Sequence, residues 1–254
     1  MRLLIIDAMN LIRRVFAAVE QGELAIEATQ TRCLAVIGRQ ADAWQASHLI
    51  TVFEWPATTW RHQLWPDYKA GRAPMPQLLA DALPGVLHYL EKNGVPCLSM
   101  DCWEADDVIA SVALNAYQHR LDVQIMSTDK GFCQLVRPGI QIRNHFDRSD
   151  WDVTQVTDMY GLRPDQLVDF WALMGDTTNH LPGVAGIGRK TAAQLLDRFG
   201  SLDATLVQME SFGDERWAKQ LQQDWRQALL TRLLVRLRTD LELGVSLKSM
   251  RWGG

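Results

Sequence analysis

The sequence predicts an α/β fold, in which a central, mainly parallel sheet is flanked by helices and followed by a helical module. Helical patterns such as residues 29–45 and 77–91 separate β-rich runs, and this alternation is typical of parallel sheets. The β-rich runs support the sheet most strongly because each is followed directly by an acidic residue. They are residues 3–6, 48–53 and 121–128.

Composition limits the class of protein. The 254 residues, 47% of them hydrophobic, are enough to bury one or two cores. A formal net charge of -4 argues against a generally basic nucleic-acid coat, but it allows a basic groove around an acidic site. No apolar run reaches membrane-spanning length, and the charged start, MRLLIID, is typical of a strand rather than a signal peptide. The four cysteines form no CxxC pair, so we expect free thiols in a reducing cytoplasm. We also expect a monomer that contacts no membrane.

The acidic residues that follow the three β-rich runs are Asp7, Glu54 and Asp129. In open α/β sheets, ligands bind at the edge where the carboxyl ends of parallel strands meet. A single acid at a strand end is usually a turn residue or a helix N-cap. Three of them in one chain favour a carboxylate cluster at that edge of the sheet.

The stretch WEADDVIA, residues 103–110, supplies three more acids: Glu104, Asp106 and Asp107. On a helix, positions 104 and 107 share a face and 106 lies beside them, so all three can point into one cleft. Two like charges about 4 Å apart repel by roughly 4 kcal/mol at an effective dielectric near 20. Bound Mg²⁺ or Mn²⁺ removes this cost and prefers oxygen ligands. The alternative is an acidic first helical turn that only complements the helix dipole.

The segment 60–76 lies between the second β-rich run and the acidic stretch, and it mixes cations, aromatic residues and prolines. Such a composition suits a mobile element that contacts a phosphate backbone and stacks on bases. An ordinary polar loop has the same composition, and composition alone favours that simpler interpretation.

The composition shifts near residues 147–158, and from there onward the pattern is helical with little strand signal. We therefore expect two domains, 1–155 and 156–254.

The second domain contains the stretch GVAGIGRKTA, in which three glycines make a tight turn that leads into a helix. Backbone N–H groups and the helix N-terminus can hold a phosphate there, assisted by Arg189, Lys190 and Thr191. The GxxxxGK[ST] spacing of a Walker loop is absent. A glycine-rich turn between helices, without a ligand, is the alternative.

Together these residues resemble the 5′-nuclease family, and most closely its small stand-alone bacterial flap endonucleases. The matching stretches cover nearly the whole chain in the family's order: IIDAMNLIRR, VFEW, RHQLWPDYKAGR, EADDVIA, STDKGFCQL and GDTTNHLPGVAGIGRKTA. The resemblance implies a PIN-like nuclease domain with a helical arch, followed by a helix–three-turn–helix DNA-binding module. It also implies a phosphodiesterase that uses two metal ions.

The resemblance implies a first divalent-metal site, with Asp107 adjacent, on Asp7, Glu54, Glu104 and Asp106. A second site would draw on Asp129 and Asp176 and would share Asp106. Lys69 and Arg72 match the family's YKxxR segment, whose lysine contacts the scissile phosphate at the base of the arch. The implied cofactor is Mg²⁺, for which Mn²⁺ can substitute.

The family's helix–three-turn–helix grips duplex DNA and is similar to sites that bind K⁺ through main-chain carbonyls. The matching carbonyl positions are Leu173, Met174, Pro182, Val184 and Ile187. The matching DNA-binding positions are Gly186, Ile187, Gly188, Arg189, Lys190 and Thr191. Because carbonyls at a helix end carry partial negative charge, a monovalent cation there is physically reasonable.

Three positions depart from the family pattern. Glu54 stands where the family usually has Asp, so the carboxylate is kept on a longer arm. Gly131 and Asn179 stand where the family has acids, so the second site loses two ligands. Paired metals stabilise both the attacking and the leaving oxygens, so this loss is expected to slow the chemistry without removing DNA binding.

We therefore expect a metal-dependent, structure-specific endonuclease that hydrolyses phosphodiester bonds at 5′ flaps of branched duplex DNA. Lys69 and Arg72 would stabilise the developing negative charge. The alternative is a DNA-junction binding protein of the same fold with little or no turnover. Retention of Asp129 and Asp176 favours the enzyme, whereas Gly131 and Asn179 favour the binding protein.

Overall fold

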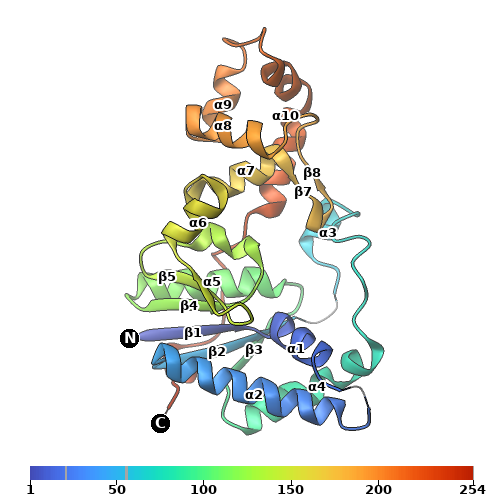
Figure 1. Cartoon of the computed structure of the whole chain (residues 1–254), viewed down its shortest axis with the longest axis vertical. Helices are drawn as coiled ribbons and strands as arrows, with labels where there is room; N and C mark the ends of the chain where they lie inside the picture. Colours follow the sequence, from blue (N-terminus) through green and yellow to red (C-terminus); the bar gives the residue numbers. More distant parts are fainter. Residues whose placement is uncertain (21, 55–56, 254) are drawn as a thin grey trace.

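A six-stranded sheet forms the centre of the computed structural model, which describes residues 1–20, 22–54 and 57–253 (Figure 1). The strand order is β3-β2-β1-β4-β5-β6, and all neighbours are parallel except β5 and β6, which are antiparallel. The prediction of a central, mainly parallel sheet is therefore confirmed, although β6 was not foreseen. The strands are β1 (Arg2–Asp7), β2 (His48–Phe53), β3 (Cys97–Ser99), β4 (Asp122–Met126), β5 (Ile140–Asn144) and β6 (Ser149–Trp151).

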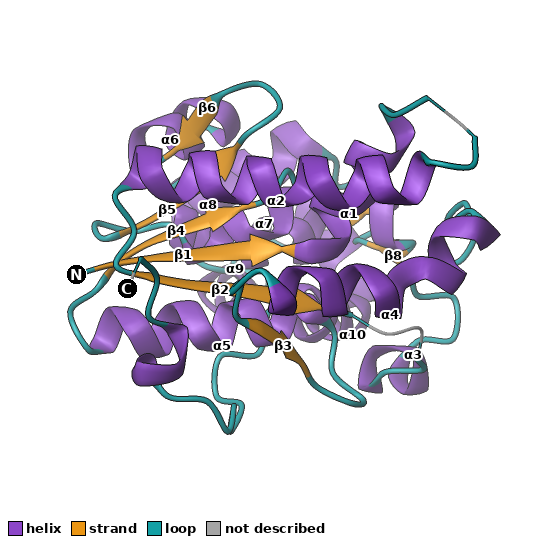
Figure 2. Ribbon diagram, turned by 90° about the horizontal axis from the view of Figure 1, so that it is seen from below, coloured by secondary structure: helices purple, strands orange, loops and turns teal. Residues whose placement is uncertain are grey.

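Helices cover both faces of this sheet (Figure 2). In β1, Leu4 and Ile6 join the core on one face while Leu3 and Ile5 join the core on the other, and all four are fully buried. An apolar run that is buried on both faces is typical of a central parallel strand. One face is covered by α1, α2 and α4 and the other by α5; their bounds are Ala8–Ala17, Ala25–Trp44, Gln77–Lys92 and Ala105–Gln118.

A helical part stands beyond one edge of the sheet and lengthens the molecule (Figure 1). A short antiparallel hairpin, β7 (Gly175–Asp176) and β8 (Leu181–Pro182), connects two of its helices. None of the described helices is both long and apolar enough to span a membrane. The helices are α6 (Val153–Tyr160), α7 (Leu167–Met174), α8 (Arg189–Phe199), α9 (Leu202–Gln208) and α10 (Arg216–Val235). The 3-10 turns among the described residues are η1 (Lys130–Leu135), η2 (Pro164–Gln166), η3 (Thr177–Asn179) and η4 (Leu247–Met250).

The segment 60–76 contains one short helix, α3 (Trp60–Leu64), and then runs through turns and extended backbone to α4. Pro66, Gly71 and Pro74 account for this, because proline removes a backbone donor and glycine is a poor helix former. In the described residues, the helical arch implied by the resemblance is thus represented only by α3.

Helix α4 continues through Pro84. A proline inside a helix removes one backbone hydrogen bond and favours a kink. Burial of Leu79, Leu83, Val86 and Leu90 along one side of α4 holds the helix together across this position.

The last residues of the chain return to the sheet. After α10 ends at Val235, Arg238 N donates to Asp107 Oδ1 of α5 at 2.9 Å, and Trp252 N donates to Ser47 O at 3.1 Å. The expected domain 156–254 therefore ends in a segment that packs on the sheet part, and the two termini lie on the same side of the sheet (Figure 2).

Candidate active site

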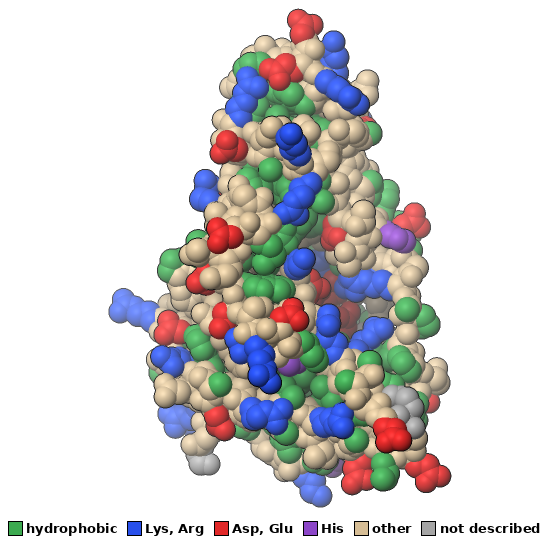
Figure 3. All heavy atoms as spheres, in the orientation of Figure 1, with side chains coloured by type: hydrophobic (Ala, Val, Ile, Leu, Met, Phe, Trp, Pro, Cys, Tyr) green, Lys and Arg blue, Asp and Glu red, His purple; other side chains and the backbone are tan. Residues whose placement is uncertain are grey.

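The acids at the strand ends line one cleft, which lies at the edge of the sheet beside α1 and the segment 60–76. Asp7 ends β1, Glu54 follows β2, and Asp129 follows β4 after a short turn. Asp106, from the first turn of α5, lines the same cleft. Figure 3 shows acidic side chains on the floor of a hollow, with Lys and Arg side chains around it. We call Asp7, Glu54, Asp106 and Asp129 the cleft acids.

Asp7 is held by two neighbours. Its Oδ1 accepts from Asn10 N at 3.1 Å, which caps the start of α1, and its Oδ2 accepts from the Ser127 hydroxyl at 2.7 Å. Each carboxylate oxygen has a second lone pair. The side chain is therefore fixed in orientation and still has acceptor capacity.

The cleft acids repel one another. Burial raises the pKa of Asp7 to about 6, with smaller contributions from the charges of Asp129 and Glu54 and against its hydrogen bonds to Ser127 and Asn10. Burial also raises the pKa of Asp106 well above its usual value, and the neighbouring acids add to this although Lys69 opposes it. Because burial disfavours the ionised forms of Asp7 and Asp106, a cation that stabilises these forms would be favoured at this cleft.

The first turn of α5 points its acids in two directions, which contradicts the expectation that all three face one cleft. Glu104 and Asp107 are 1% and 0% exposed and both contact buried Arg61, whereas the Asp106 side chain is 24% exposed. Residues three apart share a helix face, so the spacing correctly places Glu104 beside Asp107. That shared face is directed at Arg61, and Asp106 projects from a different one.

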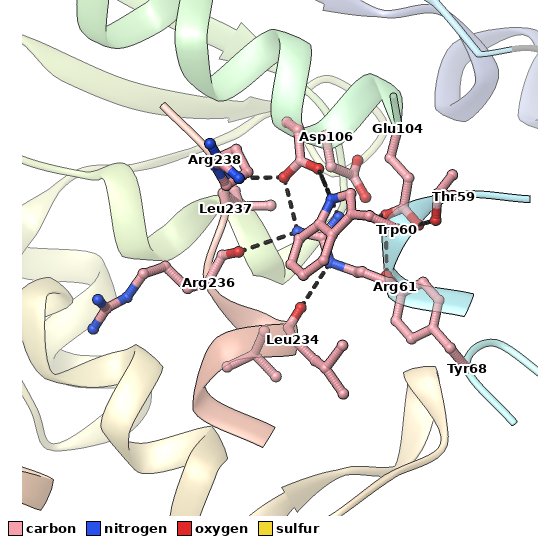
Figure 4. Close-up of polar contacts among 12 residues, drawn as sticks. Thr59, Trp60, Arg61, Tyr68, Glu104, Asp106, Leu234, Arg236, Leu237 and Arg238 are labelled. Carbon is pink, nitrogen blue, oxygen red and sulfur yellow. Dashed lines mark hydrogen bonds and ion pairs between the residues drawn. The ribbon is translucent and has the colours of Figure 1, made fainter. Parts of the chain in front are cut away.

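Arg61 neutralises the buried acids (Figure 4). Its Nη1 and Nη2 donate to Asp107 Oδ2 and Oδ1 at 2.7 and 2.8 Å, and Nη1 also donates to Glu104 Oε2 at 3.0 Å. Its Nε and Nη2 donate to the carbonyls of Leu234 and Arg236, at the end of α10. A buried carboxylate with this set of partners is a structural group. We therefore remove Asp107 from the candidate metal ligands.

Both carboxylate oxygens of Glu104, like those of Asp107, already accept hydrogen bonds. Its Oε1 accepts from the Thr59 hydroxyl at 3.0 Å, and its Oε2 accepts from Tyr68 and Lys69 at 3.1 and 3.3 Å in addition to Arg61. Burial acts to raise the pKa of Glu104, but Lys69, Arg61 and these hydrogen bonds outweigh it and hold the pKa below its usual value. The geometry therefore does not favour Glu104 as a direct metal ligand.

Lys69 and Arg72 are two of the cations that line the same cleft as the cleft acids. Lys69 Nζ lies 3.3 Å from Glu104 Oε2 and 3.9 Å from Asp106 Oδ2. Burial acts to lower the pKa of Lys69, but Asp106 and the other acids outweigh it and raise the pKa, so the ammonium stays charged. Arg72 is exposed and its Nη2 donates to Asn179 Oδ1 at 2.6 Å.

The acids assigned to a second metal site act as local caps. Asp129 Oδ1 accepts from Gly131 N at 2.7 Å. Asp176 Oδ1 accepts from Thr178 N at 3.0 Å, and its Oδ2 accepts from Asn179 Nδ2 at 2.5 Å. Asp129 lines the cleft with Asp7 and Asp106, and Asp106, Asp129 and Asp176 together line an adjoining pocket between the sheet part and the helical part. A second metal site on Asp129, Asp176 and Asp106 therefore stays a prediction.

Within residues 1–20, 22–54 and 57–253, no three or more His, Cys, Asp or Glu side chains are grouped so that they could hold a metal ion directly. Mg²⁺ commonly keeps several waters and is bound by only one or two carboxylates. The cleft acids offer hard oxygen ligands, and burial disfavours the ionised forms of Asp7 and Asp106. They therefore fit a hydrated Mg²⁺ or Mn²⁺ better than a cage of direct ligands.

The carbonyls predicted to bind K⁺ lie at the end of α7 and around β8. Several already accept hydrogen bonds: Leu173 O from Val184 N at 2.8 Å, Val184 O from Ile187 N at 3.0 Å, and Pro182 O from the Thr231 hydroxyl at 2.6 Å. The two segments are in such close contact that a Cβ added to Gly183 would lie 2.5 Å from Leu173 O. The predicted K⁺ positions, with Met174, are thus brought together in space, but binding of K⁺ stays a prediction.

The glycine-rich turn that follows is anchored to α10. Ala185 N donates to Asp224 Oδ2 at 2.9 Å, and Gly186 has a φ of 81°, where a Cβ would collide with the Gln220 side chain. Ile187 is 3% exposed and its N–H donates to Val184 O. Its side chain is therefore a core residue, and the geometry does not favour it as a DNA contact.

The N-terminus of α8 is open to solvent. Its N-cap, Gly188, has no side chain that could cap the helix, and Lys190 is exposed. Arg189 is partly engaged, because its Nη2 donates to Met159 O at 2.7 Å, and Thr191 is half-buried. Of the predicted DNA-binding side chains, Lys190 is the most available.

The importance of Arg61 was missed in the sequence. It lies in the segment 60–76, whose cations we expected to contact phosphate, yet it is 1% exposed. Spacing does not distinguish a buried arginine from an exposed one. Two buried acids on one helix face, Glu104 and Asp107, are the signal that could have indicated a buried cation.

Comparison with known proteins places the chain in context. A family model described as 5′-3′ exonuclease, N-terminal resolvase-like domain, matches residues 2–161, and one described as 5′-3′ exonuclease, C-terminal SAM fold, matches residues 162–254. The chain is 40% identical over 254 residues to the flap endonuclease Xni of Cronobacter sakazakii, covering 99% of this chain and 98% of that protein. It is 43% identical over 251 residues to the flap endonuclease Xni of Pectobacterium carotovorum, covering 98% and 94%.

Solved structures of lower identity share the fold. A bacteriophage T5 flap endonuclease in a pseudo-enzyme-product complex with DNA and metal ions superposes with a TM-score of 0.78 at 21% identity, covering 92% of this chain and 89% of that one. The T5 5′-exonuclease with bound divalent zinc ions has the same TM-score at 20% identity, with coverage of 94% and 90%.

Proposed function

Because the chain belongs to the 5′-3′ exonuclease family, we propose that it is a structure-specific endonuclease that uses a divalent metal to hydrolyse 5′ flaps of branched duplex DNA. The observation that carries the proposal is the group of cleft acids, which line one cleft where burial disfavours the ionised forms of Asp7 and Asp106. The two relatives, similar over nearly their whole length, are named flap endonucleases. The T5 enzyme of the same fold is described with DNA and metal ions.

Asp106 is the central ligand in this proposal. It lies among the other cleft acids, and its carboxylate has no buried arginine partner of the kind that occupies Asp107. Asp7, Glu54 and Asp129 would help Asp106 to hold the metal. A divalent metal held there would supply activation of water near neutral pH and polarisation of the phosphate.

Lys69 and Arg72 act on the phosphate. Lys69 stays charged because Asp106 and Glu104 stabilise its ammonium, and it lies beside the cleft acids, where the scissile phosphate would lie. A fixed cation at this place stabilises the negative charge that develops on the phosphate oxygens in the transition state. Arg72 contributes a planar set of donors that matches phosphate geometry.

Duplex DNA binds at a distance from the cleft acids, at the glycine-rich turn 183–188 and the N-terminus of α8. The backbone of Gly186 and Gly188, the helix N-terminus, Lys190 and Thr191 face a duplex phosphate, because an uncapped helix N-terminus favours an anion. The K⁺ site predicted at the neighbouring carbonyls belongs to the same DNA-binding element.

We further propose that the protein acts as a monomer in the cytoplasm. All four cysteines are free, which suits a reducing compartment.

The proposal is tested with an end-labelled 5′-flap duplex, incubated in Mg²⁺, in Ca²⁺ and in a chelator. We expect cleavage near the junction in Mg²⁺ only, with much slower cleavage of a blunt duplex or of the isolated flap strand. If the protein binds the flap substrate but does not cut it in Mg²⁺ or Mn²⁺, the chain is a junction-binding protein and the proposal is wrong. The observation that favours this alternative is that Asp176 already accepts hydrogen bonds from Thr178 N and Asn179 Nδ2.

A matched pair of variants sharpens the test. Asp129→Asn removes a cleft acid, whereas Asp176→Asn changes an acid that serves as a local cap. We expect the first variant to lose far more flap cleavage than the second. Equal losses would instead support a second metal site that includes Asp176.

A further inference from the structure

The loop between β7 and β8 holds the segment that carries Lys69 and Arg72. Asn179 O accepts from Lys69 N at 3.0 Å, and Asn179 Oδ1 accepts from Arg72 Nη2 at 2.6 Å. The next residue, His180, accepts at its carbonyl from Trp65 Nε1 at 3.1 Å. Two adjacent residues of the helical part therefore fix three points of a segment that belongs to the sheet part.

This segment needs such a restraint. Lys69 has a φ of 57° and Gly71 a φ of 73°. A lysine adopts this left-handed conformation rarely, and only where the surrounding structure stabilises it. The hydrogen bond from Lys69 N to Asn179 O is one such contact, and the His180 ring lies against Gly71, 3.3 Å from where a Cβ would be.

The side chain of Asn179 has the chemistry of a bridge. Its oxygen accepts from Arg72 and its nitrogen donates to Asp176 Oδ2. An amide offers both an acceptor and a donor, whereas an ionised carboxylate only accepts. An aspartate at this position could bind Arg72, but it could not donate to Asp176 and would repel it. The residue that stands where the family has an acid is thus suited to joining two side chains.

We propose that Asn179 is a positioning residue for the phosphate-binding cations, acting on Lys69 through its carbonyl and on Arg72 through its amide oxygen. This inference rests on the proposed function, because it requires Arg72 to meet the phosphate. In this proposal, the loop between β7 and β8 holds Lys69 and Arg72 in place beside the cleft acids.

The test is a double-mutant cycle on kcat and KM for flap cleavage, with Asn179→Ala, Arg72→Ala and both together. Asn179→Ala keeps the carbonyl that binds Lys69 and removes only the side-chain bridge. We expect kcat to fall by about tenfold to hundredfold, as for other misplaced catalytic groups, with a much smaller change in KM. The double variant should be no slower than Arg72→Ala alone, because Asn179 acts through Arg72.

Additive losses would overturn the inference, since they would mean that Asn179 acts independently of Arg72. A parental kcat in Arg72→Ala would also overturn it, while metal-dependent flap cleavage by the same preparation would leave the proposed function standing. Thr178→Ala, an exposed neighbour on the same turn, is the matched control and should keep the parental kcat.

Asn179→Asp separates the bridge from a metal ligand. We expect its kcat to fall below the parent, because the acid cannot donate to Asp176. A kcat above the parent together with a lower Mg²⁺ requirement would mean that this position serves a metal ion, and the inference would be wrong.

Discussion

The two sides of the first turn of α5 carry the same kind of side chain in opposite electrostatic settings. Glu104 and Asp107 face Arg61, which donates to both of them, and the pKa of Glu104 lies below its usual value. Asp106 lies among other carboxylates and beside Lys69, and burial raises its pKa. The acids at the start of α5 are thus divided into a pair compensated by Arg61 and a residue that joins the cleft acids.

This difference indicates a structural role for Glu104 and Asp107 and a metal-binding role for the cleft acids. The compensated pair joins α5 to the segment 60–76 and to the end of α10, because Arg61 also binds the carbonyls of Leu234 and Arg236. The cleft acids lie close enough to repel one another, and a divalent cation would relieve this repulsion. Substitutions on the two sides should therefore have opposite consequences for stability and for cleavage.

The largest effect on stability is expected for Arg61→Ala. Removing this guanidinium leaves Glu104 and Asp107 buried without their main cation, and breaking a buried pair on one side typically costs about 3–5 kcal/mol. Urea unfolding measures the loss. The matched control is Arg198→Ala, whose ion pair with Glu215 is exposed and should contribute less than about 1 kcal/mol. Equal losses in the two variants would contradict the structural role of Arg61.

The next effect is a pH dependence of the metal-free protein. The pKa of Asp7 is about 6 when folded and near 3.8 when unfolded, so the folded state binds more protons between these values. Its contribution to stability is present below about pH 4 and is lost as the pH rises through about 6, with a magnitude of about 3 kcal/mol. In a chelator, the free energy of unfolding of the parent should fall between about pH 4 and pH 6, and Asp7→Asn should lack this fall. Outside this range, the two proteins should have the same pH dependence. The same dependence in both proteins would remove Asp7 as its source.

A smaller structural effect is expected for Gly186→Val, away from both groups of acids. The left-handed φ of 81° disfavours a branched residue, and the Gln220 side chain occupies the place of the new Cβ. Fluorescence anisotropy in Ca²⁺ should show weaker flap binding than the parent and a smaller gain from K⁺ over Na⁺. Parental binding in both salts would mean that the turn only connects two helices.

The smallest effect is expected for Lys190→Ala, which removes one exposed charge. Each phosphate contact contributes a slope of about -0.9 in log affinity against log salt on duplex DNA. The variant should bind all branched duplexes more weakly to a similar extent, and its slope should be shallower by at most about one unit. An unchanged slope would exclude Lys190 from the phosphate contacts.

Much of the fold follows from the sequence because its signals are local. The apolar runs that end at Asp7, Glu54 and Asp129 predicted parallel strands, and the sheet and the family resemblance are confirmed. The short strand β6 and the hairpin of β7 and β8 were not predicted, since strands of two or three residues have no detectable period.

The candidate site was only partly predictable, because the direction of a side chain depends on distant partners. Asp106 and Asp107 are neighbours in the same acidic stretch, and nothing local indicates which of them faces a buried arginine. The pairing of Asn179 with Arg72 is likewise invisible, because the two are brought together only when the helical part meets the sheet part. Charge compensation across the fold decides these roles.

The most direct test compares Asp106→Asn with Asp107→Asn under identical conditions, measuring flap cleavage in Mg²⁺ and urea unfolding in a chelator. Asp106→Asn should be at least as stable as the parent without metal, because it removes a charge from a repulsive group, and it should lose flap cleavage by at least about 100-fold. Asp107→Asn should be destabilised by about 3 kcal/mol, yet its folded fraction should cleave within about tenfold of the parental rate. An Asp106→Asn variant that cuts like the parent, or a stable Asp107→Asn variant without activity, would contradict the division of α5 into a structural and a catalytic side.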